Sequence, residues 1–155
     1  MVASYQGKLH EPKREQYPLT REFMSRSFLT VKPDDDIYAV MDLLLKKKAT
    51  GAPVIGAEGQ LAGMISEKDC LKMVVRDIYE NQHHGGPVSH YMTTEVITVG
   101  PKHGLNRVAE LFINHPFKKL PVVADGKLVG VVRRHEVLAQ LQEFHRKRLY
   151  FMYQG

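Results

Sequence analysis

The segment PVIGAEGQLAGMISEKD, residues 53–69, decides the fold because the chain repeats it as LPVVADGKLVGVVRRHE, residues 120–136. Each copy holds two apolar runs on either side of a glycine-containing turn, and this pattern is a strong signal for a β-hairpin. Each copy then continues from a glycine through two apolar residues into a polar stretch that closes with an acid. The sequence therefore predicts two hairpins of the same kind, each leading into a helix.

The repetition extends beyond the hairpins and divides the chain into two similar halves. A shift of 68 positions places Thr30-Val31 on Thr98-Val99 and Pro33 on Pro101. A one-residue slip in the hairpin turn, where an insertion disturbs a fold least, changes the shift to 67. Self-similarity at a fixed shift is the signature of a duplicated structural unit.

Each half is expected to have the order strand, helix, strand, strand, helix. The first strands are FLTV (residues 28–31) and VITV (residues 96–99), and apolar positions 37, 40, 41, 44 and 45 have the spacing of one helical face. The closing helices are expected to bury Leu71, Val74, Val75 and Ile78 in the first half, and Val137, Leu138, Leu141 and Phe144 in the second. Because a unit of about 55 residues is marginal alone, we expect an α+β fold in which two pseudo-twofold-related units pack sheet to sheet around a common core.

These patterns divide the chain into five parts. They are an N-terminal extension (1–22), a first repeat (23–80), a polar, glycine-containing linker (81–90), a second repeat (91–145) and a basic, aromatic tail (146–155). Net charge is +5, which suits an anionic partner without identifying one. The basic and aromatic residues near the C-terminal end suit stacking on single-stranded nucleic acid, but the end of a last helix is the favoured interpretation.

The composition excludes several classes of protein. The single cysteine, Cys70, rules out an internal disulfide and a multi-cysteine metal site, and His83-His84 in a glycine-containing linker do not form a rigid ligand set. No apolar run approaches the roughly 20 residues that span a bilayer, and residues 1–20 lack the apolar core of a signal peptide. We find no nucleophile-elbow, P-loop or HExxH pattern. We therefore expect a cytoplasmic protein that is not an enzyme and holds no metal.

The duplicated pattern resembles a tandem pair of cystathionine-β-synthase (CBS) domains, also called a Bateman module. The resemblance rests on TVKP and TVGP and on the two P-V…G-x-L-x-G blocks, and it covers residues 23–145. It implies a module that binds AMP, ADP, ATP or S-adenosylmethionine between its repeats, needs no catalytic cofactor and regulates an effector protein. An interaction scaffold with a vestigial nucleotide site and a nucleic-acid-binding protein are the alternatives.

The family's ligand signature is Gly-x-x-Ser/Thr-x-x-Asp, and the first repeat matches it in full with Gly63, Ser66 and Asp69. The second repeat has Arg133 and Glu136 at the two polar positions, so the resemblance implies one complete ribose site. A carboxylate suits a ribose diol, and a hydroxyl at a helix N-terminus suits a phosphate. The same Ser-x-x-Asp spacing is close to a capping box, which does not exclude ligand contact.

The resemblance places the rest of the ligand against the second repeat. Lys118 and Lys119 precede its Leu-Pro-Val strand and are expected to meet a phosphate, with a solvated loop as the alternative. The adenine is expected along Thr94, Val96 and Ile97, and Pro121 is a further candidate contact. In the other cleft, Arg133 is free to fill the space, to pair with Glu136 or to hold another anion.

The first helices carry more apolar surface than one core requires. Leu111, Phe112 and Ile113 are consecutive, and three consecutive residues span about 200° of a helix. We therefore expect a homodimer through the first helices of both repeats, centred on Leu43 and Leu111, with the second helices as further candidates. The alternative is that Leu43 and Leu111 pack under the N-terminal extension or the C-terminal tail.

Overall fold

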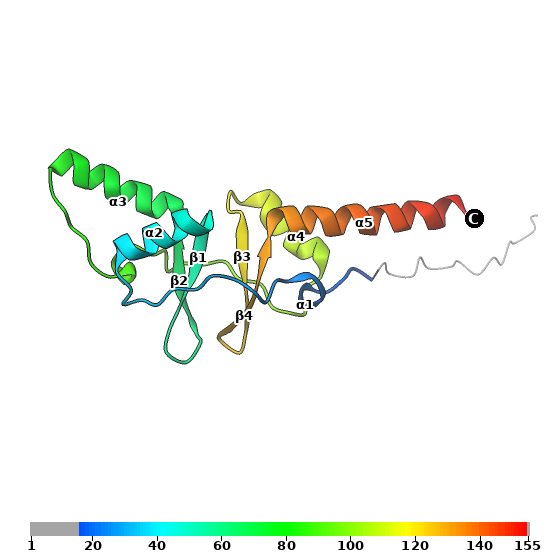
Figure 1. The fold of residues 1–155 in the computed structure, drawn as a ribbon. Helices are drawn as coiled ribbons and strands as arrows, with labels where there is room; N and C mark the ends of the chain where they lie inside the picture. Colours follow the sequence, from blue (N-terminus) through cyan, green and yellow to red (C-terminus); the bar gives the residue numbers. More distant parts are fainter. Residues whose placement is uncertain (1–15, 155) are drawn as a thin grey trace, which may run out of the picture.

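The computed structural model describes residues 16–154 and consists of two halves with the same architecture, which confirms the α+β fold of two repeats (Figure 1). In chain order the elements are α1 (Thr20–Phe23), α2 (Ile37–Lys47), β1 (Gly51–Ile55), β2 (Leu61–Ser66), α3 (Glu67–Glu80), η1 (Val88–His90), α4 (Leu105–Asn114), β3 (Lys119–Ala124), β4 (Lys127–Arg133) and α5 (Arg134–Tyr153). Residues 1–15 of the predicted extension and residue 155 of the predicted tail lie outside the described part. No helix within the described part is both long and apolar enough to cross a membrane.

Both predicted hairpins are present, and they contact each other through their turns. Strands β1 and β2 form one antiparallel pair and β3 and β4 the other, each with a bulge at the same place. The turn of the second hairpin needs two left-handed residues, and Asp125 and Gly126 supply them with φ of 51° and 77°. The amide of Leu128 donates to the carbonyl of Gly59 at 3.1 Å, so the hairpins lie side by side (Figure 1).

The predicted first strands are shorter than expected, because each is a single bridged residue. Val31 pairs in parallel with Val54, and Val99 pairs in parallel with Val122. A proline stands two residues after each of these valines and has no N–H to continue a ladder. The prediction of four-residue strands was therefore wrong, although the segments run where they were expected to run.

The segment that precedes the first strand of each repeat, here called its leading segment, pairs with the hairpin of the other repeat. The backbone of Thr93, near the start of the second repeat, pairs with Met64 on β2 through bonds of 2.8 and 2.9 Å. In the same way, Ser25 of the first repeat pairs with Val131 on β4 through bonds of 2.8 and 2.9 Å. Each repeat therefore adds a short edge to the hairpin of the other.

This crossed pairing brings the leading segments close to the glycine that both copies carry in their second hairpin strand. A Cβ atom on Gly63 would stand 2.7 Å from the carbonyl oxygen of Thr93 and 2.9 Å from the sulfur of Met92. A Cβ atom on Gly130 would stand 2.6 Å from the sulfur of Met24. Gly63 needs to be glycine because the backbone of the other repeat crosses directly over it. At Gly130 the close atom belongs to the flexible side chain of Met24, and the nearest backbone atom, the carbonyl oxygen of Ser25, is 3.2 Å away.

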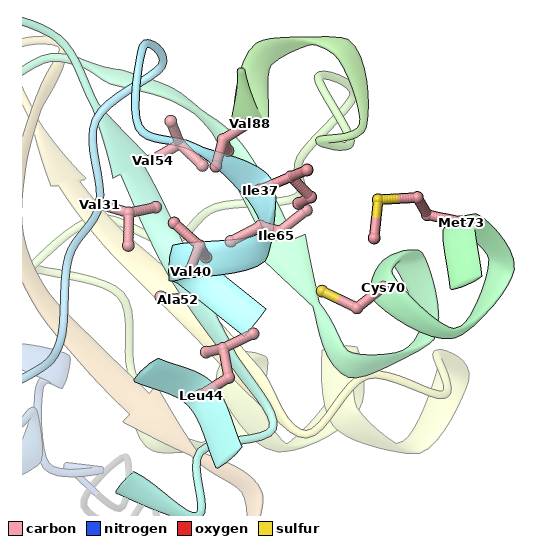
Figure 2. Close-up of a cluster of buried hydrophobic side chains, with 10 residues drawn as sticks. All are labelled: Val31, Ile37, Val40, Leu44, Ala52, Val54, Ile65, Cys70, Met73 and Val88. Carbon is pink, nitrogen blue, oxygen red and sulfur yellow. The ribbon is translucent and has the colours of Figure 1, made fainter. Parts of the chain in front are cut away.

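The apolar interior is divided into two clusters, one in each repeat, rather than forming the single common core that was expected. Figure 2 shows the first cluster, in which side chains from α2, both strands, α3 and η1 meet. Its buried members are Val31, Ile37, Val40, Leu44, Ala52, Val54, Ile65, Cys70, Met73 and Val88. Helix α2 therefore packs with the face that its apolar spacing predicted, except that Leu45 is exposed.

The closing helix α3 packs only in part with the face that was predicted, because Val74 lies against the first cluster while the other three predicted residues are exposed. Its buried residues are Cys70, Met73 and Asp77, whereas Leu71, Val75 and Ile78 are 63%, 46% and 72% exposed. Both sets have helical spacing, and the set with the smaller side chains lies against the hairpin. In α5, Val137 is buried as predicted, Leu141 and Phe144 are half-buried, and Leu138 is exposed. The exposed residues of α3 form an apolar stripe on the outside of the first repeat.

A cluster of hydrogen bonds around Asp77 of α3 holds His84, in the middle of the linker between the repeats. The Tyr38 hydroxyl donates to Asp77 Oδ2 at 2.5 Å, and Nδ1 of His84 lies 2.5 Å from Asp77 Oδ1. Nε2 of His84 lies 3.2 Å from Glu80, and Val88, further along the linker, is fully buried. Residues 81–90 are thus part of the first repeat's packing, not a free connection.

The Asp77 cluster should make stability depend on pH in the acid range. The hydrogen bond from Tyr38, then the one from His84, holds the pKa of Asp77 below its ordinary value, and the Tyr38 bond raises the pKa of that phenol to about 12. A carboxyl group with a lowered pKa stabilises the fold above its unfolded pKa of about 3.9, and this stabilisation is lost as the pH falls through the folded value. We expect Asp77→Asn to lower Tm at neutral pH, and the difference from the unaltered chain to shrink below about pH 4.

Thermal unfolding followed by circular dichroism from neutral pH down to about pH 3 measures this difference. Glu80→Gln is the matched control, because the Glu80 side chain is half-exposed and touches only the outer nitrogen of His84. It should lower Tm less than Asp77→Asn at every pH. Parallel Tm curves for Asp77→Asn and the unaltered chain across the acid range would show that the carboxylate charge is not what matters.

The homodimer through the first helices stays a prediction, and the structure adds a second candidate surface. Leu43 and Leu111 are half-buried against the clusters of their own repeats, but Leu45 on α2 and Ile113 on α4 are 67% and 79% exposed. The apolar stripe on α3 is exposed to a similar degree. We predict a homodimer, of about 35 kDa from a chain of 17.7 kDa, whose interface lies on the first helices or on this stripe.

Light scattering on a chromatography peak tests this assembly. Leu45→Asp should shift the mass toward 17.7 kDa if the first helices form the interface, and Leu71→Asp and Ile78→Asp should do so if α3 forms it. The substitutions on one surface are the control for the other, because the three side chains are exposed to a similar degree. A dimer that survives all three substitutions would place the interface elsewhere, and a monomer of the unaltered chain at micromolar concentration would refute the dimer.

Candidate functional site

A cavity of about 590 Å³ opens between the two repeats and has the size of a small-molecule site. Its walls are residues 50–51 and 64–69 of the first repeat and residues 93, 95–97, 115–119 and 121 of the second. The crossed pairing of Thr93 with Met64 is what brings these segments together. Seven of the eight predicted site residues line the cavity: Ser66, Asp69, Val96, Ile97, Lys118, Lys119 and Pro121.

The first-repeat wall is the point where β2 ends and α3 begins. Ser66 is the last residue of β2 and the N-cap of α3, and its hydroxyl accepts from the Asp69 amide at 3.2 Å. Asp69 Oδ2 accepts from the amide and from the hydroxyl of Ser66, each at 2.9 Å. The capping-box interpretation is therefore confirmed, and it fixes both side chains at the rim of the cavity.

This cap leaves part of the site available to a ligand. Both bonds to the Asp69 carboxylate end on Oδ2, so within residues 16–154 its Oδ1 has no partner. The first amides of a helix are not used by the helix itself, and they point toward any anion placed ahead of it. Here the amide of Glu67 already donates to the carbonyl oxygen of Thr50 at 3.0 Å. The wall thus offers an ionised acceptor beside a helix N-terminus.

The second-repeat wall carries the cations. Lys118 and Lys119 both line the cavity, and the ammonium of Lys119 donates to the carbonyl of Gly51 across the cleft at 2.7 Å. Burial, and then the neighbouring Arg133, lowers the pKa of Lys119, while Glu67 acts in the opposite direction. Lys119 is therefore a half-buried residue of the cleft rather than part of a solvated loop.

The predicted adenine segment reaches the cavity in part. Val96 and Ile97 line it, and Pro121 lies on the adjoining strand β3. Thr94 is not among the lining residues, although Thr93 and Glu95 on either side of it are.

The sequence reasoning missed an aromatic part of the wall. His115, Pro116 and Phe117 follow α4 and line the cavity directly before the two lysines. The rings of His115 and Phe117 stack at 5.0 Å, and Phe112 meets Phe117 edge to face at 5.7 Å. A signal was present, because the matching positions 47–49 of the first repeat read Lys-Lys-Ala and hold no aromatic residue.

The pseudo-equivalent position in the second repeat is built differently. Arg133 Nη1 donates to Glu136 Oε1 at 3.1 Å, so of the three roles left open for Arg133 the structure shows pairing with Glu136. Arg133 is the N-cap residue of α5 but makes no side-chain cap bond. The other oxygen of Glu136 is buried and has no partner within residues 16–154. The acidic group that corresponds to Asp69 is thus committed to an arginine.

The arrangement in the first cleft suits one kind of molecule. A carboxylate oxygen and a helix N-terminus lie on one wall, two lysines lie on the other, and apolar and aromatic side chains complete the enclosure. Such a cavity can hold a flat ring, a hydroxylated group and an anion at the same time.

Comparison with known proteins agrees with this picture. The sequence profile described as "CBS domain" matches the chain twice, at residues 21–76 and 88–143. Protein MJ1225 of Methanocaldococcus jannaschii is 34% identical over 112 residues, which cover 72% of this chain and 39% of that protein. The chain thus spans less than half of MJ1225. Protein MJ1426 of the same organism is 29% identical, with 79% of this chain and 90% of that protein covered.

Among solved structures, CBSX2 from Arabidopsis thaliana has a similar fold. Its crystal structure in complex with AMP matches with a TM-score of 0.73 and 30% identity, and the match covers 82% of this chain and 98% of that one. A second CBSX2 structure matches with the same TM-score and identity and covers 84% of this chain.

The cap at Ser66 gives a prediction that does not depend on any ligand. Ser66→Ala removes the oxygen that accepts from the Asp69 amide, and losing an N-cap costs about 1 kcal/mol. For a chain of this size we expect Tm to fall by roughly 2–4 °C. Thermal unfolding measures the change, and Ser66→Thr, which keeps a hydroxyl, is the control that should retain most of the stability. Equal losses in the two variants would show that the cap is not the stabilising feature.

Proposed function

The chain belongs to the CBS domain family and carries two copies of the domain, and on this premise we propose that it is a non-catalytic regulatory module that binds an adenosine-containing ligand between its repeats. The ligand is AMP, ADP, ATP or S-adenosylmethionine. Binding is read by an effector protein that contacts the module, and the module acts as a homodimer.

One observation carries this proposal. Asp69 and Lys119 come from different repeats, and the fold places them on facing walls of one cavity with the volume of a nucleotide-sized ligand. Support also comes from CBSX2, which shares the fold and 30% of aligned residues and was crystallised with AMP. Catalysis is not part of the proposal.

Each wall has a defined role in this proposal. Asp69 Oδ1 accepts hydrogen bonds from the ribose hydroxyls, and an ionised acceptor makes the stronger kind of hydrogen bond. The N-terminus of α3 and the two lysines receive the anionic end of the ligand. The adenine packs among Val96, Ile97 and Pro121, with Phe117 as a further apolar neighbour.

A second candidate function is an interaction scaffold whose nucleotide site is vestigial. The observation in its favour is that one oxygen of the second repeat's acid, Glu136, is paired with Arg133, while α3 offers an exposed apolar stripe. Titration with adenosine ligands separates the two functions, because a scaffold folds and assembles without responding to them.

The proposed function predicts a ligand-dependent rise in stability. At a ligand concentration of 100 times Kd, a single site stabilises the fold by about 2.7 kcal/mol. For a chain of this size that is a rise in Tm of roughly 5–10 °C. A thermal-shift screen with AMP, ADP, ATP and S-adenosylmethionine should find at least one such ligand, and no response to any of them would leave the scaffold function.

Calorimetry with the active ligand then tests the site itself. Asp69→Ala should weaken binding by about 1.5–3 kcal/mol, the value of a hydrogen bond to a charged group. Glu136→Ala is the matched control at the same position of the second repeat, and it should change binding much less because its carboxylate is paired with Arg133. Equal losses in the two variants would contradict a single asymmetric site.

A further inference from the structure

Lys119 and Gly51 occupy the same place in the two repeats, 68 positions apart at the start of β3 and of β1. They meet at the boundary between the repeats, where the Lys119 ammonium donates to the Gly51 carbonyl at 2.7 Å. Gly51 is confined by its own hairpin, because a Cβ atom there would lie 2.7 Å from the carbonyl oxygen of Ile65. The contact is therefore made by a side chain from one repeat and a bare backbone from the other.

The surroundings of Lys119 favour a stronger acceptor than this carbonyl. Lys119 is half-buried, and Arg133 is its partner across the β3–β4 pair, so a second positive charge stands close by. The nearest opposing charge is Glu67, at the start of α3 on the other wall of the cavity. A bond to an anion is shorter and roughly twice as strong as a bond to a neutral group.

We propose that Lys119 changes its acceptor when the cavity fills, leaving the Gly51 carbonyl for the phosphate of an anionic adenosine ligand. This inference rests on the proposed function and adds to it how the site distinguishes an anionic ligand from a neutral one. A neutral adenosine ligand fits the same cavity but offers no anion, so it leaves the Lys119–Gly51 contact intact. A phosphorylated ligand removes this direct bond between the repeats, and adenosine does not.

Two consequences distinguish this role from that of a surface lysine that only attracts anions. Lys119 contributes to the preference for a phosphorylated over an unphosphorylated ligand, because it bonds to the phosphate while the carboxylate and the apolar wall serve both ligands equally. The same exchange alters the hydrogen bonding of the Gly51 carbonyl, and the neighbouring Ala52 amide reports on that carbonyl.

The experiment compares AMP with adenosine on the full chain by calorimetry. We expect the unaltered chain to bind AMP about 10- to 100-fold more tightly than adenosine, the effect of one hydrogen bond to a charged group. Lys119→Met should reduce this ratio to a few-fold. Lys119→Arg keeps the charge and should restore most of the ratio. Lys102→Met, an exposed lysine of the second repeat outside the cavity, controls for the loss of one positive charge.

Nuclear magnetic resonance supplies the second readout on the same samples. AMP and the Lys119→Met substitution should shift the ¹⁵N resonance of Ala52 in the same direction, and adenosine should not. If both ligands bind but Lys119→Met leaves their ratio unchanged, or AMP leaves Ala52 unmoved, the exchange of acceptors is overturned while the proposed function stands. If neither ligand binds the unaltered chain, the proposed function falls and this inference falls with it.

Discussion

The crossed pairing of the leading segments is the constraint on which the rest of the structure depends. The bonds between Thr93 and Met64 tie the start of the second repeat to the last strand of the first, and Ser25 and Val131 make the reciprocal tie. Without them each repeat would be a hairpin with two helices, too small to be stable alone. The same crossing carries residues 95–97 to the rim where α3 begins, so the pairing that stabilises the fold also builds the cavity.

The two repeats share a fold but do not form two equal sites, because the polar residues at corresponding positions of the repeats differ. The first repeat places a serine cap and an available carboxylate oxygen at the end of its second strand, and the second repeat places an arginine bonded to Glu136 there. The cations show the opposite distribution, with Lys119 in one repeat facing Gly51 in the other. Asp69 and Lys119 line the same cavity, so both differences between the repeats fall on one cavity.

The sequence predicts the parts of this structure that depend on local pattern. The hairpins, the Asp-Gly turn and the Ser66–Asp69 cap follow from residue types at fixed spacing, and the structure has all three. The packing face of α3 could not be predicted in this way, because two sets of residues on that helix both have helical spacing. The crossing over Gly63, the Asp77 cluster and the aromatic wall at Phe117 depend on contacts between distant segments, which no local pattern encodes.

The Asp77 cluster connects the two ends of the cavity wall through α3. This helix starts at the Ser66 cap beside the cavity, and at its other end Asp77 holds His84 of the linker. The linker then passes the buried Val88 and returns to the cavity, where Thr93 pairs with Met64. Helix, linker and strand thus form a closed circuit with both ends at the site. The same helix that caps the cavity wall with Ser66 carries the apolar stripe on the outside of the molecule, so the site and the exposed surface belong to one element.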